Sequence, residues 1–300
     1  MTINKHILSY IAGYFDGDGC FSIREENIQN RSKYLAQFIV ISTNKIVLQF
    51  IKKYIGGSIT IGSKREQFPN QKIQYRFCIC GKRSADIAEI ILPFLIEKKK
   101  QCQCYIQFTR TKCKNKKKLL LKKMKKLKTS CDLITKDDTD SLKKIKRTRK
   151  TKTYDFSYLA GFIDAECSLG IYRYRSKNRE NFLYKTTFQL NNTKYPCFFF
   201  LMSRFGGSVS YVPPKRKKRA QISWKLSSKA LHDILPKIYP FLVTKKPVCE
   251  ELINFRKLVL KNGGARHTRS FKESYKCNLI ERDRIFHYVH QLNHRGFLSI

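Results

Sequence analysis

Two stretches of the sequence each contain a pair of acids at the same spacing. "SYIAGYFDGDGCFSI" covers residues 9–23, and "SYLAGFIDAECSLGI" covers residues 157–171. In each stretch an apolar run with small residues leads to two acids one residue apart, and the later acids are Asp18 and Glu166. A carboxylate at the C-terminal end of a helix meets the negative end of the helix dipole. Such an acid is unfavourable there, and its recurrence in both stretches marks Asp18 and Glu166 as candidate functional residues.

The segments that follow these stretches also match each other in order. "KKYIGGSITI" (52–61) matches "MSRFGGSVSY" (202–211), and "LPFLIEKKKQC" (92–102) matches "YPFLVTKKPVC" (239–249). One repeat of about half the chain indicates a gene duplication rather than a short-period solenoid. A chain of this length can form two domains, each with its own core.

Each half has the same predicted order of elements. A helix over about 7–17 or 155–165 leads to strands, a helix, a Gly-Gly turn, two strands and further helices. The predicted fold class is α+β, with two pseudo-symmetric αββαββα repeats. Each repeat is a four-stranded antiparallel sheet with helices on one face. We divide the chain into an N-terminal repeat (1–111), a basic linker (112–152) and a C-terminal repeat (153–300).

Short glycine pairs predict where two helices end. Gly56-Gly57 and Gly206-Gly207 each follow an apolar run and precede a strand-like segment. Glycine is common just after a helix because it adopts left-handed backbone angles at low cost. The two pairs therefore predict helix C-termini that turn into strands.

The charge of the chain favours a polyanionic partner. Its 62 Lys and Arg residues outnumber 22 Asp and Glu residues, for a formal net charge of +40. Such a field attracts nucleic acid or an anionic membrane. No run of 18 apolar residues occurs, and the charge is spread through strand-like segments, so nucleic acid is favoured over a membrane. Within the linker, "KKKLLLKKMKKLK" (116–128) has the spacing of a basic helix, and the rest is typical of a flexible tether near DNA phosphates.

Cysteines and histidines show no metal-binding spacing. The eleven cysteines include no C-x-x-C pair, so we expect free thiols in a reducing compartment rather than disulfides or zinc. His287, His290 and His294 have helical spacing but no matching ligand pattern, so we interpret them as surface or packing residues. The first residues lack the pattern of a signal peptide.

Polar side chains recur at every second position of the predicted strands, which places them on one face of each sheet. A sheet face that was only exposed to solvent, without binding nucleic acid, would carry more Asp and Glu. Lys, Arg, Gln, Ser, Thr and Tyr can contact phosphates and base edges in a major groove. The predicted DNA-binding residues are Ser22, Arg24, Glu26, Lys33, Gln37, Lys72, Gln74, Arg76, Tyr172, Tyr174, Lys185, Thr187, Gln189, Lys215, Arg216, Gln221, Ser223 and Lys225.

The acid-bearing stretches resemble the motifs of a known enzyme family. "YIAGYFDGDG" (10–19) and "YLAGFIDAEC" (158–167) are similar to the two motifs of monomeric, double-motif LAGLIDADG homing endonucleases. The resemblance covers nearly all the chain outside 112–152. It implies one chain acting as a monomer on double-stranded DNA, with the motif helices side by side between the repeats. The small residues at that contact are Ala12, Gly13, Ala160 and Gly161.

The resemblance also implies a catalytic centre that uses a divalent metal. The family's metal-binding acids correspond to Asp18 and Glu166, and the carbonyls of Gly17 and Ala165 are the matching further ligands. Mg²⁺ prefers such oxygen ligands. Mn²⁺ would also serve, and Ca²⁺ is expected to support binding without cleavage. The metal would activate a water and stabilise the departing 3′ oxygen of the phosphodiester. Further catalytic residues are expected at Lys98, Lys245, Ser42 and Asn192.

Two residues of the second motif depart from the family pattern. Glu166 replaces the more usual Asp, and Cys167 stands at a turn position where Gly is usual and special backbone angles are expected. Both changes suggest unequal metal sites or reduced activity. The earlier acids, Asp16 and Asp164, are expected to accept hydrogen bonds from backbone amides rather than to bind metal.

The leading prediction is therefore a site-specific, metal-dependent DNA endonuclease, and two alternatives stay open. An intron maturase could use the same fold and charge to bind intron RNA, and a DNA-binding regulator would not cleave at all. Retention of both metal acids favours cleavage. The abundance of Lys, Ile, Asn, Phe and Tyr suggests an AT-rich coding sequence. Together with the family, this points to an intron-borne gene of a chloroplast or mitochondrion.

Overall fold

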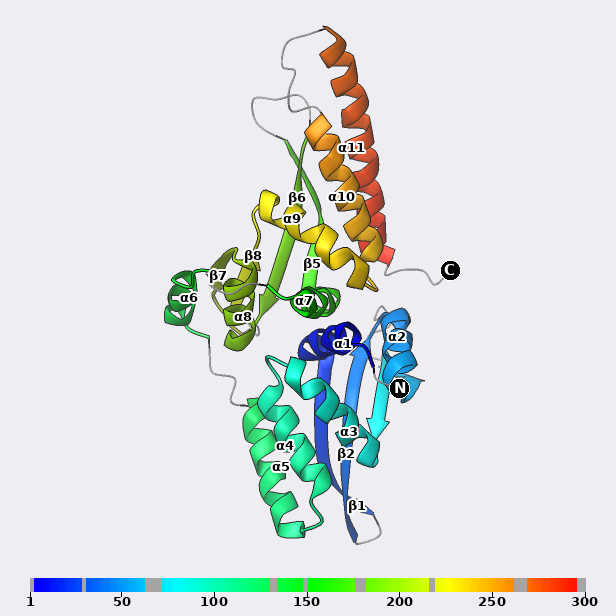
Figure 1. Ribbon diagram of the computed structural model, residues 1–300, viewed down its shortest axis with the longest axis vertical. Coiled ribbons are helices and arrows are strands. Elements are labelled where there is room, and N and C mark those ends of the chain that lie inside the picture. Colours follow the sequence, from blue (N-terminus) through cyan, green and yellow to red (C-terminus); the bar gives the residue numbers. More distant parts are fainter. Residues whose placement is uncertain are drawn as a thin grey trace.

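The computed structural model describes residues 3–28, 31–62, 72–129, 134–147, 151–175, 182–215, 219–261 and 269–295. Two repeats lie end to end along the long axis, and helices α1 and α7 lie between them (Figure 1). The N-terminal repeat contains α1 (Lys5–Asp18), β1 (Gly19–Ile28), β2 (Arg31–Ser42), α2 (Lys45–Ile55), β3 (Ser58–Ile61), β4 (Tyr75–Cys80), α3 (Gly81–Ile91), the 3-10 helix η1 (Leu92–Phe94) and α4 (Lys99–Arg110).

The C-terminal repeat has the same order of elements. It contains α7 (Thr153–Glu166), β5 (Cys167–Arg175), β6 (Phe182–Asn192), α8 (Tyr195–Phe205), β7 (Ser208–Val212), β8 (Gln221–Lys225), α9 (Ser228–Ile238), the 3-10 helix η2 (Tyr239–Phe241), α10 (Lys246–Lys261) and α11 (Arg269–Arg295). The strand orders are β1-β2-β4-β3 and β5-β6-β8-β7, and every pairing is antiparallel. The predicted α+β class with two four-stranded repeats is confirmed.

One face of each sheet forms the core. In the N-terminal sheet Phe21 is the cross-strand partner of Phe38, and both side chains are fully buried beside Phe15 of α1. In the C-terminal sheet Trp224 is fully buried, and its Nε1 donates to the carbonyl of Gly206 at 2.8 Å. Helices such as α3, α4 and α9 cover this face in Figure 1. The core therefore fixes which face of each sheet stays open.

The predicted Gly-Gly turns are confirmed. Gly56 and Gly57 have φ of 69° and 102°, and Gly206 and Gly207 have φ of 70° and 97°. These left-handed angles follow the ends of α2 and α8, where a residue with a Cβ would be strained. Each pair reverses the chain into the next strand, β3 or β7.

The basic segment between the repeats is more ordered than the tether we expected. Its first part forms α5 (Lys114–Thr129), which lies beside α4 with Leu120 and Met124 buried. Its second part contains α6 (Lys136–Lys143), which packs on the C-terminal repeat at β7 and α8. The predicted basic helix is therefore present, but its apolar side chains join the core of a repeat because they can be buried against α4. No helix among the described residues is both long and apolar enough to span a membrane.

The two repeats meet where the backbones of α1 and α7 touch. A Cβ on Gly13 would lie 2.1 Å from the carbonyl oxygen of Tyr158, and a Cβ on Gly161 would lie 2.0 Å from that of Tyr10. Ala12 and Ala160 are fully buried beside them. The small residues therefore permit a contact that any larger side chain would prevent, as the resemblance implied.

We expect Gly13→Ala and Gly161→Ala to destabilise the protein by about 1–3 kcal/mol each, because the added methyl overpacks this contact. An ordinary glycine inside a helix behaves in the opposite way, since replacement by alanine usually stabilises by roughly 0.5–1 kcal/mol. Urea unfolding of each variant measures the change. Gln49→Ala on the exposed side of α2 is the control. A gain in stability for either glycine variant would contradict the close backbone contact.

Candidate active site and DNA-binding faces

The two motif acids lie together at the ends of the central helices. Asp18 is the last residue of α1, and Glu166 is the last residue of α7. A Cβ on Gly17 would lie 2.4 Å from Cβ of Ala165 and 3.0 Å from Cγ of Glu166, so the helix ends touch there. The close contact of the helices thus brings two carboxylates from distant parts of the sequence to one place.

These carboxylates are destabilised as anions. Burial raises the pKa of Asp18, and the neighbouring hydroxyl of Tyr14 and the charges of Lys98 and Lys245 oppose that shift. Burial also raises the pKa of Glu166, and the nearby charge of Asp18 raises it further. Like charges brought together away from water favour protonation, and a cation between them would reverse the effect.

Lys98 and Lys245 provide part of the compensation at the helix ends. Lys98 Nζ donates to the carbonyl oxygens of Phe15, Asp16 and Gly17 at 2.8, 2.5 and 3.0 Å. Lys245 Nζ donates to those of Ile163 and Asp164 at 2.6 and 2.7 Å. The carbonyls of Phe15 and Ile163 also accept from the backbone N–H groups of Gly19 and Cys167, and an ammonium at this position opposes the helix dipole. Both lysines are half-buried rather than solvated, and they lie at the site we predicted for them.

The inner acids hold the lysine-bearing loops in place. Asp16 accepts hydrogen bonds from the backbone N–H groups of residues 96, 97 and 98 at 2.8–3.1 Å, and from the hydroxyl of Tyr158 at 2.7 Å. Asp164 accepts the equivalent bonds from residues 243, 244 and 245 and from the hydroxyl of Tyr10. Their predicted role as acceptors from backbone amides is confirmed. The tyrosines add a link across the repeats that sequence reasoning missed.

Cys167 does not cause the backbone problem that we expected. Gly19 and Cys167 both have extended backbone angles, with φ of −84° and −90°. A Cβ on Gly19 would clash with the ring of Phe15 at 2.2 Å, whereas the matching position in α7 is Ile163. The expectation of special backbone angles was therefore wrong. Gly19 makes room for the ring of Phe15, whereas the second motif has the smaller Ile163 and can therefore have Cys167 in place of glycine.

A cavity of about 410 Å³ opens beside the Asp18 end of the helices. Asp18, Tyr14, Ser42, Lys245 and the backbone around Ala165 line it. The hydroxyl of Tyr14 donates to Ser42 Oγ at 3.1 Å, so the predicted polar residue lies near the acid. On the opposite side, Asn192 Nδ2 donates to Glu97 Oε2 at 3.4 Å. Sequence reasoning missed Tyr14 and Glu97.

The oxygen donors at the helix ends fit a divalent metal better than a soft one. No three His, Cys, Asp or Glu side chains cluster as metal ligands in the described part of the chain. What the site offers is two destabilised carboxylates and the adjacent carbonyls of Gly17 and Ala165, which are hard oxygen donors suited to Mg²⁺. The Gly17 carbonyl already accepts from Lys98. The carboxylates of Asp18 and Glu166 are therefore the stronger candidates to hold a metal.

Cysteine and histidine side chains form no metal-binding cluster with these acids among the described residues. The described cysteines are all free thiols. His287, His290 and His294 are exposed on α11, where His287 lies 3.4 Å from Asp283 and the rings of the other two are 4.4 Å apart. These positions agree with a surface or packing role.

The open face of the N-terminal sheet carries the predicted polar side chains. Arg76 Nη2 donates to Gln37 Oε1 at 3.0 Å, and Ser22 is the cross-strand partner of Gln37. Arg24 is exposed and forms an ion pair with Glu26 at 2.7 Å. Three further predicted residues are exposed near the edges of this face, and they are Lys33, Lys72 and Gln74. Lys72 and Gln74 precede β4, and Lys72 Nζ lies 3.5 Å from the carbonyl oxygen of His294.

The open face of the C-terminal sheet is similar except at one position. Tyr172 and Tyr174 are exposed and stacked, and Lys185 is exposed opposite Tyr172. Thr187, Gln189 and Gln221 are half-buried, and Lys215 and Lys225 are exposed. Ser223 is only 1% exposed, because Gln189 lies over it and donates to its hydroxyl at 3.1 Å. Ser223 therefore orients Gln189, and its direct contact with DNA stays a prediction. Arg216 lies outside the described residues.

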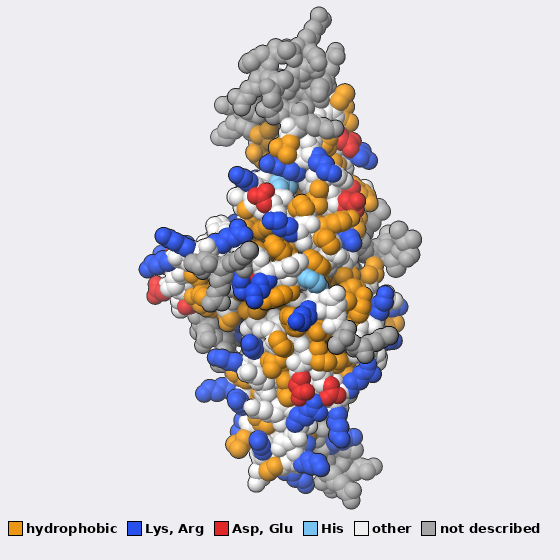
Figure 2. Space-filling model, in the orientation of Figure 1, with side chains coloured by type: hydrophobic (Ala, Val, Ile, Leu, Met, Phe, Trp, Pro, Cys, Tyr) orange, Lys and Arg blue, Asp and Glu red, His pale blue; other side chains and the backbone are white. Residues whose placement is uncertain are grey.

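Lys and Arg side chains are spread over both repeats on the molecular face in Figure 2, and acidic side chains are few. This distribution agrees with the net charge and is unlike a single basic patch. A long polyanion could therefore follow both repeats.

Comparison with known proteins agrees with the fold and with the first motif. Residues 11–112 match the family model of the LAGLIDADG endonuclease. No curated protein matches the chain.

Solved structures resemble almost the whole chain. The I-SmaMI LAGLIDADG homing endonuclease bound to cleaved DNA is 17% identical with a TM-score of 0.65, and the similarity covers 99% of each chain. I-SmaMI bound to uncleaved DNA with calcium ions is 17% identical with a TM-score of 0.63, covering 95% of this chain and 98% of that one. I-GzeII with its DNA target is 15% identical with a TM-score of 0.60, covering 95% and 97%. The chain has their fold, and the resemblance to double-motif LAGLIDADG homing endonucleases is confirmed.

We expect Asp18→Asn to stabilise the metal-free protein at alkaline pH. The pKa of Asp18 is raised in the folded state, so folding costs free energy wherever the unfolded chain would ionise this acid. The gain should disappear at a pH below the ordinary range of a carboxylate, where both states are protonated. Thermal unfolding across pH measures it, with Asp233→Asn on the exposed side of α9 as the control. A variant that is less stable than the wild type at alkaline pH would contradict the strained acid pair.

Proposed function

We propose that the protein is a site-specific endonuclease that hydrolyses both strands of a long, asymmetric double-stranded DNA target with a divalent metal, as a homing endonuclease does. One observation carries the proposal: Asp18 and Glu166 lie side by side at the ends of α1 and α7. The resemblance to enzymes solved on DNA targets supports the same function.

The chain's own residues would divide the work as follows. Asp18 and Glu166 would hold Mg²⁺ or Mn²⁺, and the bound ion would activate water and stabilise the departing 3′ oxygen. Lys98 and Lys245 neutralise the helix ends and hold positive charge close to where the phosphate charge increases. Tyr14 orients Ser42 beside Asp18 through their hydrogen bond.

The open faces of the sheets would supply most of the affinity. Their Lys, Arg, Gln and Tyr side chains can contact phosphates and base edges. Because both halves of the interface are present in one chain, we propose that it acts as a monomer. We also propose intron homing in a chloroplast or mitochondrion, which the amino-acid composition supports.

Asp18→Asn should abolish cleavage but leave DNA binding in Ca²⁺ intact, because it removes one charge from the metal site and nearly keeps the shape. Glu166→Gln should behave in the same way, and Glu166→Asp should be milder. The measurement is a cleavage assay on a site selected from a randomised library, with Mg²⁺ or with EDTA. Full-rate cutting by either isosteric variant would contradict the site. A wild type that binds tightly but never cuts would favour a regulator, and preferential binding of intron RNA would favour a maturase.

Arg76→Ala should relax base preference in one half-site only. A bidentate contact from arginine to guanine discriminates by about 1–3 kcal/mol. Because Arg76 is hydrogen-bonded to Gln37, Gln37→Ala should change the same base positions. Binding to a library of single-base variants measures both. Uniform weakening across all sequences would instead assign Arg76 to a phosphate contact.

A further inference from the structure

The two ends of the helix pair are not equivalent. Alignment of the repeats places Ser42 opposite Asn192, Tyr14 opposite Phe162, and Glu97 opposite Thr244. In the half that contains Asp18, the hydroxyl of Tyr14 donates to Ser42 at 3.1 Å. Phe162 has no hydroxyl, so the half that contains Glu166 cannot make the same contact.

In the half that contains Glu166, Asn192 is hydrogen-bonded to Glu97 of the other repeat. Glu97 Oε2 accepts a hydrogen bond from Asn192 Nδ2 at 3.4 Å. Its own backbone N–H donates to Asp16 at 3.1 Å, so the loop that carries Glu97 is fixed to the N-terminal motif helix. Asn192 Oδ1 accepts from the N–H of Thr193 at 2.6 Å, which fixes the amide from its other end. Glu97 therefore bridges the interface to a residue expected to be catalytic.

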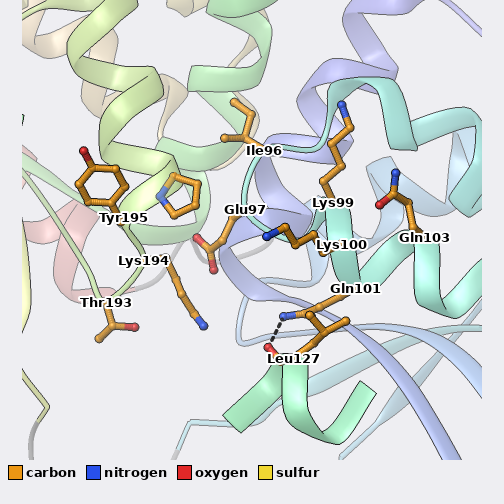
Figure 3. A pocket seen from close by; sticks show the side chains of 11 residues that line it. Ile96, Glu97, Lys99, Lys100, Gln101, Gln103, Leu127, Thr193, Lys194 and Tyr195 are labelled. Atoms are coloured by element: carbon orange, nitrogen blue, oxygen red, sulfur yellow. Dashed lines mark hydrogen bonds between the residues drawn. The ribbon is translucent and has the colours of Figure 1, made fainter. Parts of the chain in front are cut away.

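Glu97 lines a cavity between the two repeats. It encloses about 500 Å³, and Figure 3 shows Glu97 near its centre. Residues from both repeats line it, including Lys99 and Lys100 on one side and Thr193 and Lys194 on the other. The opposite cavity, with Thr244 in the equivalent position, has Asp18 in its wall. At this equivalent position one cavity therefore has the carboxylate of Glu97 and the other has the hydroxyl-bearing Thr244.

We propose that Glu97 is a positioning residue for Asn192, which it holds across the repeat interface in place of the hydroxyl that Phe162 lacks, so that the two DNA strands are cut by unequal centres. The inference rests on the proposed nuclease function. Glu97 acts through Asn192 and is not itself placed on the reacting atoms.

The environment of Glu97 makes its hold on Asn192 depend on pH. The pKa of Glu97 is raised to about 7, chiefly by burial. The charges of Lys98 and Lys194 oppose this rise, and those of Asp16 and Glu166 add to it. Lys99 and Lys100 also line the cavity. An ionised carboxylate accepts a stronger hydrogen bond from an amide than a neutral one. Asn192 should therefore be held more firmly as pH rises through neutrality.

The test measures the cleavage rate of each DNA strand separately. With each strand of the selected site labelled, Glu97→Ala should slow one strand about tenfold and leave the other unchanged, since misplaced catalytic groups lose rates of this order or more. The affected strand should be the one slowed by Asn192→Ala. Glu97→Gln keeps the acceptor and should restore most of that rate, but without the rise at higher pH. Gln103→Ala, exposed in the same cavity, is the matched control.

A second measurement does not depend on cleavage. The side-chain amide of Asn192, assigned in an ¹⁵N spectrum by its loss in Asn192→Ala, should shift with a midpoint near pH 7 in the wild type and stay constant in Glu97→Gln. A wild-type amide that does not respond to pH, or equal slowing of both strands in Glu97→Ala, would overturn the inference. If the wild type cuts no DNA at all, the nuclease proposal fails, and the amide titration alone decides the role of Glu97.

Discussion

The rest of the structure depends on the backbone contact between α1 and α7. Gly13 and Gly161 let each helix touch a carbonyl of the other at distances where no Cβ could fit. That contact joins the repeats, and it brings Asp18 and Glu166 together at the helix ends. It also carries a cost, because two acids at negative helix termini repel each other and lose water. Lys98 and Lys245 reduce this cost, and a divalent cation would complete the compensation.

The inner acids explain how the site stays aligned. Asp16 fixes the loop before Lys98 and accepts from Tyr158 of the other repeat, while Asp164 and Tyr10 form the equivalent set in the second repeat. Each lysine loop is therefore tied to its own motif helix and, through a tyrosine, to the opposite one. These bonds therefore align the two helix ends with each other, while each end keeps its own set of surrounding side chains.

Much of this was predictable because it depends on local patterns. The Gly-Gly turns need left-handed angles, the period of two identifies the sheet faces, and the duplicated motif reveals the pseudo-symmetry. The period of two could not show that Ser223 is covered by Gln189, because depth on a sheet depends on neighbouring side chains. The cross-repeat bonds of Tyr10 and Tyr158 and the bridge from Glu97 to Asn192 join residues far apart in sequence. The sequence wrongly predicted special backbone angles at Cys167, because its backbone is extended. A side chain fits there since Ile163 is smaller than Phe15, the equivalent residue of the first motif.

Anomalous diffraction from crystals of the protein on its selected DNA with Mn²⁺ tests most directly whether the two motif acids hold the metal. We expect anomalous density at the ends of α1 and α7, in contact with the carboxylates of both Asp18 and Glu166 and beside the target phosphates. Manganese bound elsewhere, with these two carboxylates free of metal on a properly seated DNA target, would contradict it.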